Sequence, residues 1–179
     1  MSLSDLAAIA SLISGTAVLV SILFLALQVR QANRNQRSLI QQARTDRNVE
    51  ILLKMAEPAM SETLAAADAH SVELNPARIW SFYGFAAAVF WSYEDTFMQL
   101  GAGTLHPDSW RSDVATLKRL CAHPSYRAVW RMARDGMSGG YRDYIDGLMD
   151  EVPPDRSRRF GDLFKACLAE ELEEELANG

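Results

Sequence analysis

An uncharged stretch near the N-terminus, residues 6–29, constrains this chain more than any other feature of its sequence. It reads LAAIASLISGTAVLVSILFLALQV and contains no Asp, Glu, Lys or Arg. A helix of about 20 apolar residues spans the roughly 30 Å hydrocarbon core of a bilayer. We therefore predict a transmembrane anchor over residues 1–29.

Two other kinds of segment are also long and apolar. A cleaved signal peptide has basic residues before its apolar core and a small-residue cleavage site after it. Here Asp5 precedes the stretch without any Lys or Arg, and Gln28-Val29-Arg30-Gln31 follows it. The second alternative is a buried helix of a soluble domain, in which so long an uncharged run is rare. The hydropathy pattern favours the anchor.

The charges that follow the anchor predict its orientation. Arg30, Arg34 and Arg37 come after the stretch, and no acid appears before Asp46. The positive-inside rule places these juxtamembrane arginines in the cytoplasm, with the N-terminus outside. Their role is either to meet anionic headgroups, at about 1 kcal/mol each, or only to set topology.

The anchor also carries a ladder of small residues. Ala7, Ser11 and Gly15 are four apart and share one face of a helix. Small residues at this spacing let helices pack closely in lipid. The ladder predicts association with a second copy or with another membrane subunit, although small residues are also simply common in membrane helices.

The rest of the chain indicates an all-α fold. No stretch alternates with period two, as a strand would. No Pro or Gly lies between Thr16 and Glu57, so we expect the anchor to continue into a stalk helix over residues 30–57. Residues 58–179 then form a multi-helix cytoplasmic domain. A net charge of −5 argues against nucleic acid as a partner.

Residues 77–100 are predicted to form the central helix of this domain. They are rich in aromatic residues and carry no charge between Arg78 and Glu94, so we expect packing on most sides and burial of Trp91. A last helix over residues 155–176 ends in a run of acids that opposes its own dipole. That end is expected to fray in water unless a basic partner holds it.

Few residues are candidates for chemistry. The three histidines, His70, His106 and His123, fit no metal-binding spacing, so we expect no metal and no cofactor. Residues 70–74 are expected to form a loop. Glu94 and Asp95 lie in the aromatic helix, where a partly buried carboxylate needs a partner, and Arg127 and Arg131 on a neighbouring helix are the candidates. Two interpretations stay open: a structural salt bridge and an acid–base pair.

Three motifs carry a resemblance. They are the anchor followed by Gln28-Val29-Arg30-Gln31, the pattern Glu94-x-x-Phe97-x-Gln99-x-x-x-Gly103-x-Leu105 with Trp110, and Pro124-x-x-Arg127-x-x-Trp130. Over most of residues 6–152 the chain resembles a family of uncharacterised bacterial proteins with one N-terminal membrane helix and an all-helical cytoplasmic domain. The resemblance implies no activity. It implies that Glu94, Gln99, Arg127 and Trp130 form one packed polar–aromatic cluster, and that the membrane is the bacterial inner membrane.

Together these features predict a non-enzymatic accessory, assembly or scaffold subunit that is anchored in the membrane by a single pass. Its partners would be the lipid bilayer and either other membrane subunits or further copies of itself. The alternative is a small membrane-tethered enzyme or ligand sensor with a pocket near Glu94 and Arg127.

Overall fold

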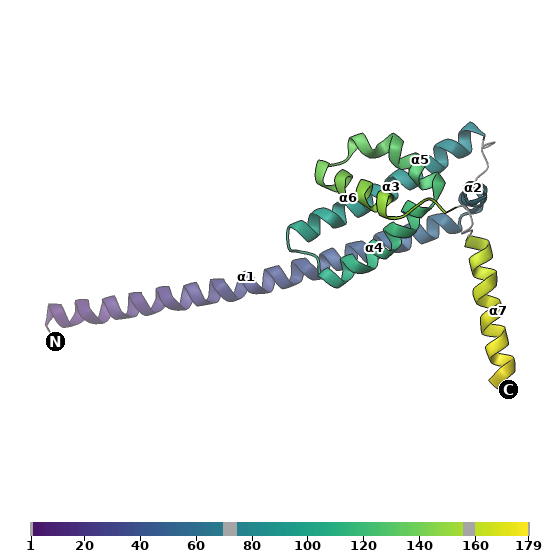
Figure 1. Ribbon diagram of the computed structural model, residues 1–179. Helices are drawn as coiled ribbons and strands as arrows, with labels where there is room; N and C mark the ends of the chain where they lie inside the picture. The colour runs from purple at the N-terminus through teal and green to yellow at the C-terminus, as the bar shows by residue number, and fades with distance from the viewer. Residues whose placement is uncertain (1, 70–74, 156–159, 179) are drawn as a thin grey trace. The chain divides into compact units, whose positions relative to one another are not determined.

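The computed structural model describes residues 2–69, 75–155 and 160–178. Within these ranges the chain forms seven α-helices and one short 3-10 helix, and no residue is in a β-strand. The all-α prediction is confirmed (Figure 1). The chain divides into two compact units, one up to Thr45 and one from Asp46 onward, and each is described by itself.

Helix α1 (Leu3–Ala56) contains the uncharged stretch and runs without a break through the predicted stalk. This continuity was expected, because no proline interrupts it. Residues 2–39 are all exposed, and the hydroxyls of Thr16 and Ser21 each donate to a backbone carbonyl one turn earlier at 2.8 Å. Among the described helices, α1 alone is long and apolar enough to cross a membrane.

Four helices of the second unit begin with proline, which suits the first helical position because its missing N–H would have no partner there. They are α2 (Pro58–Asp68), α3 (Pro76–Gly101), α4 (Pro107–Ala122) and α5 (Pro124–Ala133). Asn75 caps α3 as expected, with its Oδ1 accepting from the Arg78 N–H at 2.9 Å. Helix α3 ends before Gly103, whose φ of 69° is the left-handed conformation that glycine adopts at helix ends.

The remaining elements are η1 (Arg134–Gly136), α6 (Gly139–Glu151) and α7 (Phe160–Asn178). The last helix was predicted from residue 155 and is seen from Phe160. The expected loop over residues 70–74 lies outside the described residues.

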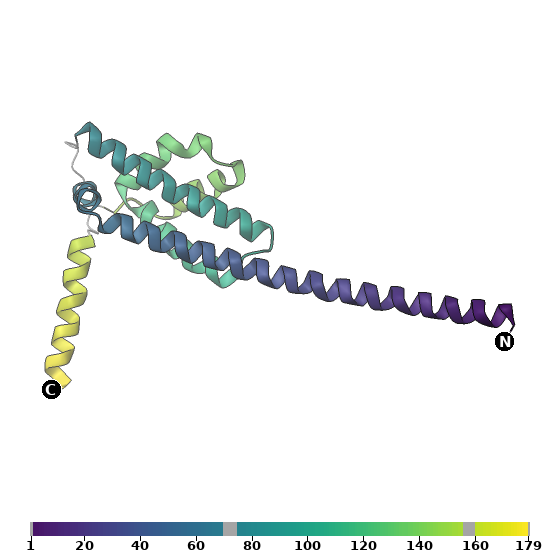
Figure 2. The same ribbon diagram turned by 180° about the vertical axis from the view of Figure 1, so that it is seen from behind.

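Helices α3, α4, α5 and α6 gather into one bundle (Figures 1 and 2). Its centre is aromatic. Phe90 of α3 lies 5.0 Å from Trp130 of α5, ring centre to ring centre, and Trp130 meets Tyr141 of α6 edge-on at 5.9 Å. The largest side chains that are almost fully buried are Phe90, Leu117, Cys121, Trp130, Tyr141 and Ile145.

One prediction about α3 is wrong. Trp91 is 56% exposed and Trp80 is 72% exposed, so the helix is not packed on most sides. Neighbouring residues on a helix point about 100° apart. The face that carries Phe90 therefore enters the bundle, while Trp91 turns out of it.

Candidate functional site

Arg127 holds the ends of two helices rather than a carboxylate. Its Nη1 lies within hydrogen-bond distance of three carbonyl oxygens: Cys121 O at 2.9 Å, Met149 O at 3.1 Å and Val152 O at 3.0 Å. The last carbonyls of a helix have no partner inside that helix, and a positive charge is favourable beside them. Arg127 thus closes the C-terminal ends of α4 and α6.

Glu94 acts at the opposite end of α6. The backbone N–H of Ser138, the N-cap residue of α6, donates to Glu94 Oε1 at 2.6 Å. A carboxylate beside a helix N-terminus satisfies an N–H that would otherwise lack a partner and complements the helix dipole. Glu94 therefore joins α3 to the start of α6.

The predicted pairing of Glu94 with Arg127 is wrong. Among the described residues no ion pair or hydrogen bond joins them, because each is used at a different end of α6. Neither the structural salt bridge nor the acid–base pair that the sequence left open is formed. Both residues bond to backbone groups at the ends of α6. Backbone groups are the same at every residue, so no sequence motif identifies them as partners.

Gln99 and Trp130 also have separate partners. Gln99 Nε2 donates to Asp95 Oδ2 at 2.9 Å on its own helix. Trp130 Nε1 donates to Asp146 Oδ1 at 2.8 Å, and the other oxygen of Asp146 forms an ion pair with Arg134. The four residues of the expected polar–aromatic cluster therefore have separate polar partners and do not form one common polar site: Glu94, Arg127 and Trp130 each bond to another element, and Gln99 bonds within α3.

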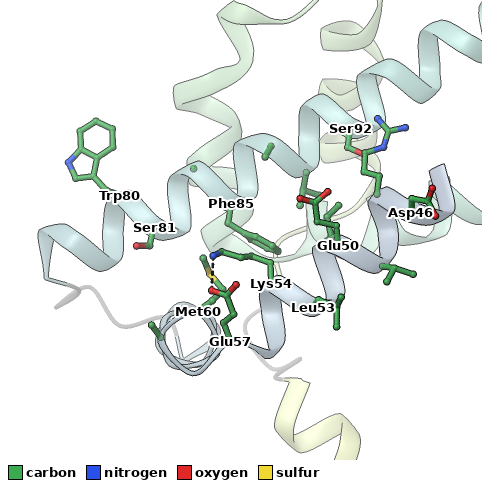
Figure 3. A pocket seen from close by; sticks show the side chains of 17 residues that line it. Asp46, Glu50, Leu53, Lys54, Glu57, Met60, Trp80, Ser81, Phe85 and Ser92 are labelled. Carbon is green, nitrogen blue, oxygen red and sulfur yellow. Dashed lines mark hydrogen bonds and ion pairs between the residues drawn. The ribbon is translucent and has the colours of Figure 1, made fainter. Parts of the chain in front are cut away.

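A groove lies elsewhere in the second unit, between residues 46–54 of α1, Glu57 and the start of α2, and α3. Its volume is about 1060 Å³. Phe85 reaches from α3 toward Lys54 of α1, which forms an ion pair with Glu57 at 2.6 Å (Figure 3). A second ion pair, Arg47 with Asp95 at 3.0 Å, connects the same part of α1 to α3.

The α3 side of this groove includes a row of small residues, which sequence reasoning missed, beside the larger Trp80, Phe85 and Val89. Ser81, Gly84, Ala88 and Ser92 all line it, and a Cβ placed at Gly84 would meet no atom within 4 Å. The signal was present in the sequence, since Gly84, Ala88 and Ser92 are four apart like the ladder in the anchor.

Candidate chemistry is sparse in the second unit. No group of three potential metal ligands occurs in the described part of the chain, and His70 lies outside it. His106 Nδ1 accepts from the Asp108 N–H at 3.2 Å and caps α4. His123 Nε2 lies 3.1 Å from Asp68 Oδ1, so this histidine connects α2 to the junction of α4 and α5.

The two cysteines differ in reactivity. Burial raises the pKa of the Cys121 thiol to about 11, which keeps it protonated at neutral pH. A thiol is a nucleophile only as its thiolate, so Cys121 behaves as a small apolar core residue. Cys167 on α7 is exposed. Burial also raises the pKa of the Tyr141 hydroxyl, which packs among aromatic rings rather than in a solvent-filled pocket.

In the first unit, the predicted membrane residues all lie on α1. Ala7, Ser11 and Gly15 are exposed, and a shallow hollow on the helix surface is lined by residues that include Ser11, Gly15 and Leu19. Arg30, Arg34 and Arg37 follow on the same helix, all of them exposed.

No protein-family model, no curated protein and no solved structure matches the chain. The resemblance to a family of bacterial membrane proteins stays a prediction, and we infer the function from the residues of this chain.

Proposed function

We propose that this protein is a non-enzymatic accessory or assembly subunit, anchored by one pass in the bacterial inner membrane and acting through contacts between helices. Its N-terminus lies outside and the domain from residue 46 onward lies in the cytoplasm. The observation that carries the proposal is α1, whose uncharged and exposed residues 6–29 continue without a break toward that domain.

The character of the exposed surface of α1 supports a membrane environment. Large apolar side chains such as Leu12, Leu19 and Leu23 are more than half exposed along this stretch. Contiguous apolar surface of this size is rare on monomeric soluble proteins. Lipid covers such a surface, and the arginines that follow it favour the cytoplasmic side for the rest of the chain.

The roles of the charged candidates also favour a scaffold over an enzyme or sensor. The alternative function needed a solvent-open pocket near Glu94 and Arg127. Both side chains are instead used to hold the ends of α6. A residue whose hydrogen bonds hold the fold together is poorly placed to exchange protons with a substrate or to follow a ligand.

The anchor offers a specific face for association. Ala7, Ser11 and Gly15 project little from the helix, and the hollow at Ser11 and Gly15 lies on this face. In lipid, helices associate through close van der Waals packing, so a flat face is the favourable one. We propose that this face contacts another copy or another membrane subunit.

The test replaces Gly15 by leucine. This change fills the flat face and keeps the segment apolar, so insertion into the membrane should persist while the complex in mild detergent becomes smaller. Ala17→Leu is the matched control, because two residues turn a helix by about 200° and place the added side chain on the other side. If both variants elute like the wild type, or if the wild type is already a monomer without partners, the ladder does not mediate association.

A further inference from the structure

The groove between α1 and α3 has room for a helix along its α3 side. Ser81, Gly84 and Ala88 are exposed there, and Ser92 continues the row of small residues by one more turn. The row therefore extends over about three turns of α3, or roughly 16 Å. The distance between two packed helices depends on the side chains at their contact, so a row of small residues permits a close approach.

Large apolar side chains lie beside this row. Leu53 of α1 is 66% exposed and Trp80 of α3 is 72% exposed, and both line the groove. Phe85 extends from α3 toward α1 (Figure 3). Exposed apolar surface that is bordered by polar residues is typical of a contact site for another molecule. A groove of this length between two helices fits an amphipathic helix, whose apolar face enters it.

The charges of the groove do not cancel. The two cations that line it, Arg47 and Lys54, each form an ion pair with a carboxylate of this chain, at 3.0 Å and 2.6 Å. Two further carboxylates, Asp46 and Glu50, line the same groove, and neither has an ion pair or hydrogen bond in the described part of the chain. They lie one turn apart on α1, and Glu50 extends toward α3 (Figure 3). The groove thus has two uncompensated negative charges along α1.

We propose that this groove binds an amphipathic helix of another protein, with basic residues along one edge of that helix. Its apolar face packs against the small residues of α3 and against Trp80. Two of its Lys or Arg residues, spaced four apart, pair with Asp46 and Glu50. This inference rests on the proposed function, because it names the chemistry of one partner of an accessory subunit.

The same charges disfavour occupants from this chain. Helix α7 has an exposed apolar face, but five glutamates fall within residues 170–175. A second copy that docked groove to groove would bring Asp46 and Glu50 close to identical carboxylates. Like charges at an interface are strongly unfavourable, so the occupant is a basic helix of a different protein.

The first experiment uses two labelled helical peptides of about four turns, or roughly 14 residues. Both have the same leucine face, and one carries lysines four apart along its edge where the other carries glutamates. Fluorescence anisotropy measures their binding to the full-length chain in a non-ionic detergent, with empty micelles as the background. Two exposed ion pairs replaced by two repulsions should make the lysine peptide bind about tenfold more tightly. Equal binding of the two peptides, or no binding above the background, would overturn the proposal.

A second experiment reverses the charge of the groove. Asp46→Lys together with Glu50→Lys should reverse the preference, so that the glutamate peptide binds more tightly. Both residues are exposed, so the domain should keep its fold. The control is Asp143→Lys with Asp150→Lys, which makes the same change in net charge at two exposed positions of α6. An unchanged preference in the groove variant, or a reversal in the control, would refute the pairing.

A third experiment fills the row of small residues. A Cβ at Gly84 meets no atom within 4 Å and leucine favours a helix more than glycine does, so Gly84→Leu should fold. The added side chain occupies the space of the bound helix and should weaken the lysine peptide about tenfold. Gly147→Leu is the matched control, since this exposed glycine of α6 also has open space around it. Equal affinities of the two variants would contradict the groove as the binding site.

The lysine peptide also separates this inference from the association proposed for the anchor. Its affinity should be the same for the Gly15→Leu variant as for the wild type, because Gly15 does not line the groove. An affinity that falls together with the size of the complex would refute binding in the groove alone. Failure of the peptide to bind would leave the result of the Gly15→Leu experiment on complex size unaffected.

Discussion

Arg127 gives the sharpest test of how the domain is held together. Replacing it by methionine keeps most of the aliphatic stem and removes the guanidinium. The three carbonyl oxygens of Cys121, Met149 and Val152 then lose the donor that they share. Methionine has no N–H to donate to any of them. The C-terminal ends of α4 and α6 therefore lose the hydrogen bonds that stabilise their contact with α5.

The expected loss follows from the geometry. The Nη1 atom carries two hydrogens, so the three carbonyls share two strong bonds, and a hydrogen bond to a charged group contributes roughly 1.5–3 kcal/mol. Because the Arg127 side chain is only half-buried, water replaces part of this hydrogen-bonding energy in the variant. We therefore take the lower value for each of the two bonds, which gives a loss of unfolding free energy of about 3 kcal/mol. The total free energy of unfolding of a small domain is only about 5–15 kcal/mol, so this loss should be easy to measure.

Urea unfolding of the full chain in mild detergent, followed by tryptophan fluorescence, measures this loss. With a slope of roughly 1–3 kcal/mol per molar urea, the midpoint should fall by about 1–3 M. The control is Arg131→Met, one turn further along α5, where the side chain is exposed and the effect should stay within about 0.5 kcal/mol. Equal midpoints for the two variants would contradict the role assigned to Arg127.

A double-mutant cycle with Glu94→Gln separates this arrangement from a salt bridge. Glu94 and Arg127 share no hydrogen-bond partner, so their two losses should add to within about 0.5 kcal/mol. A coupling energy above about 1 kcal/mol would mean that the two charges interact directly, as the sequence alone suggested.

Two further predictions concern the core and the topology. Trp130 is only 1% exposed, so Trp130→Ala should lower the unfolding free energy by roughly 3–5 kcal/mol. Trp91 is 56% exposed, so Trp91→Ala should change it by less than about 0.5 kcal/mol. Similar melting temperatures for the two variants would contradict the assigned faces of α3 and α5. A C-terminal reporter that fluoresces only in the cytoplasm should be bright, because Arg30, Arg34 and Arg37 favour the cytoplasmic side. Activity of a periplasm-only reporter at the same end would reverse the topology.

Much of the architecture was determined locally, and the sequence was sufficient to predict it. Pro58, Pro76, Pro107 and Pro124 each mark a helix start, because proline fixes a helical φ and lacks the N–H that a first turn cannot use. The same reasoning predicted the cap at Asn75. Residues 6–29 are apolar all round, so their helix and its candidate role in a membrane needed no tertiary information.

Which residues meet was decided only by the tertiary structure. Trp91 and Phe90 are adjacent and similarly apolar, yet one is exposed and the other is buried, since only the packing of α4, α5 and α6 selects a face of α3. Glu94 and Arg127 looked like partners because opposite charges attract. Each instead forms hydrogen bonds with backbone groups at an end of α6. The sequence cannot indicate which backbone groups will be partners, because every residue carries them.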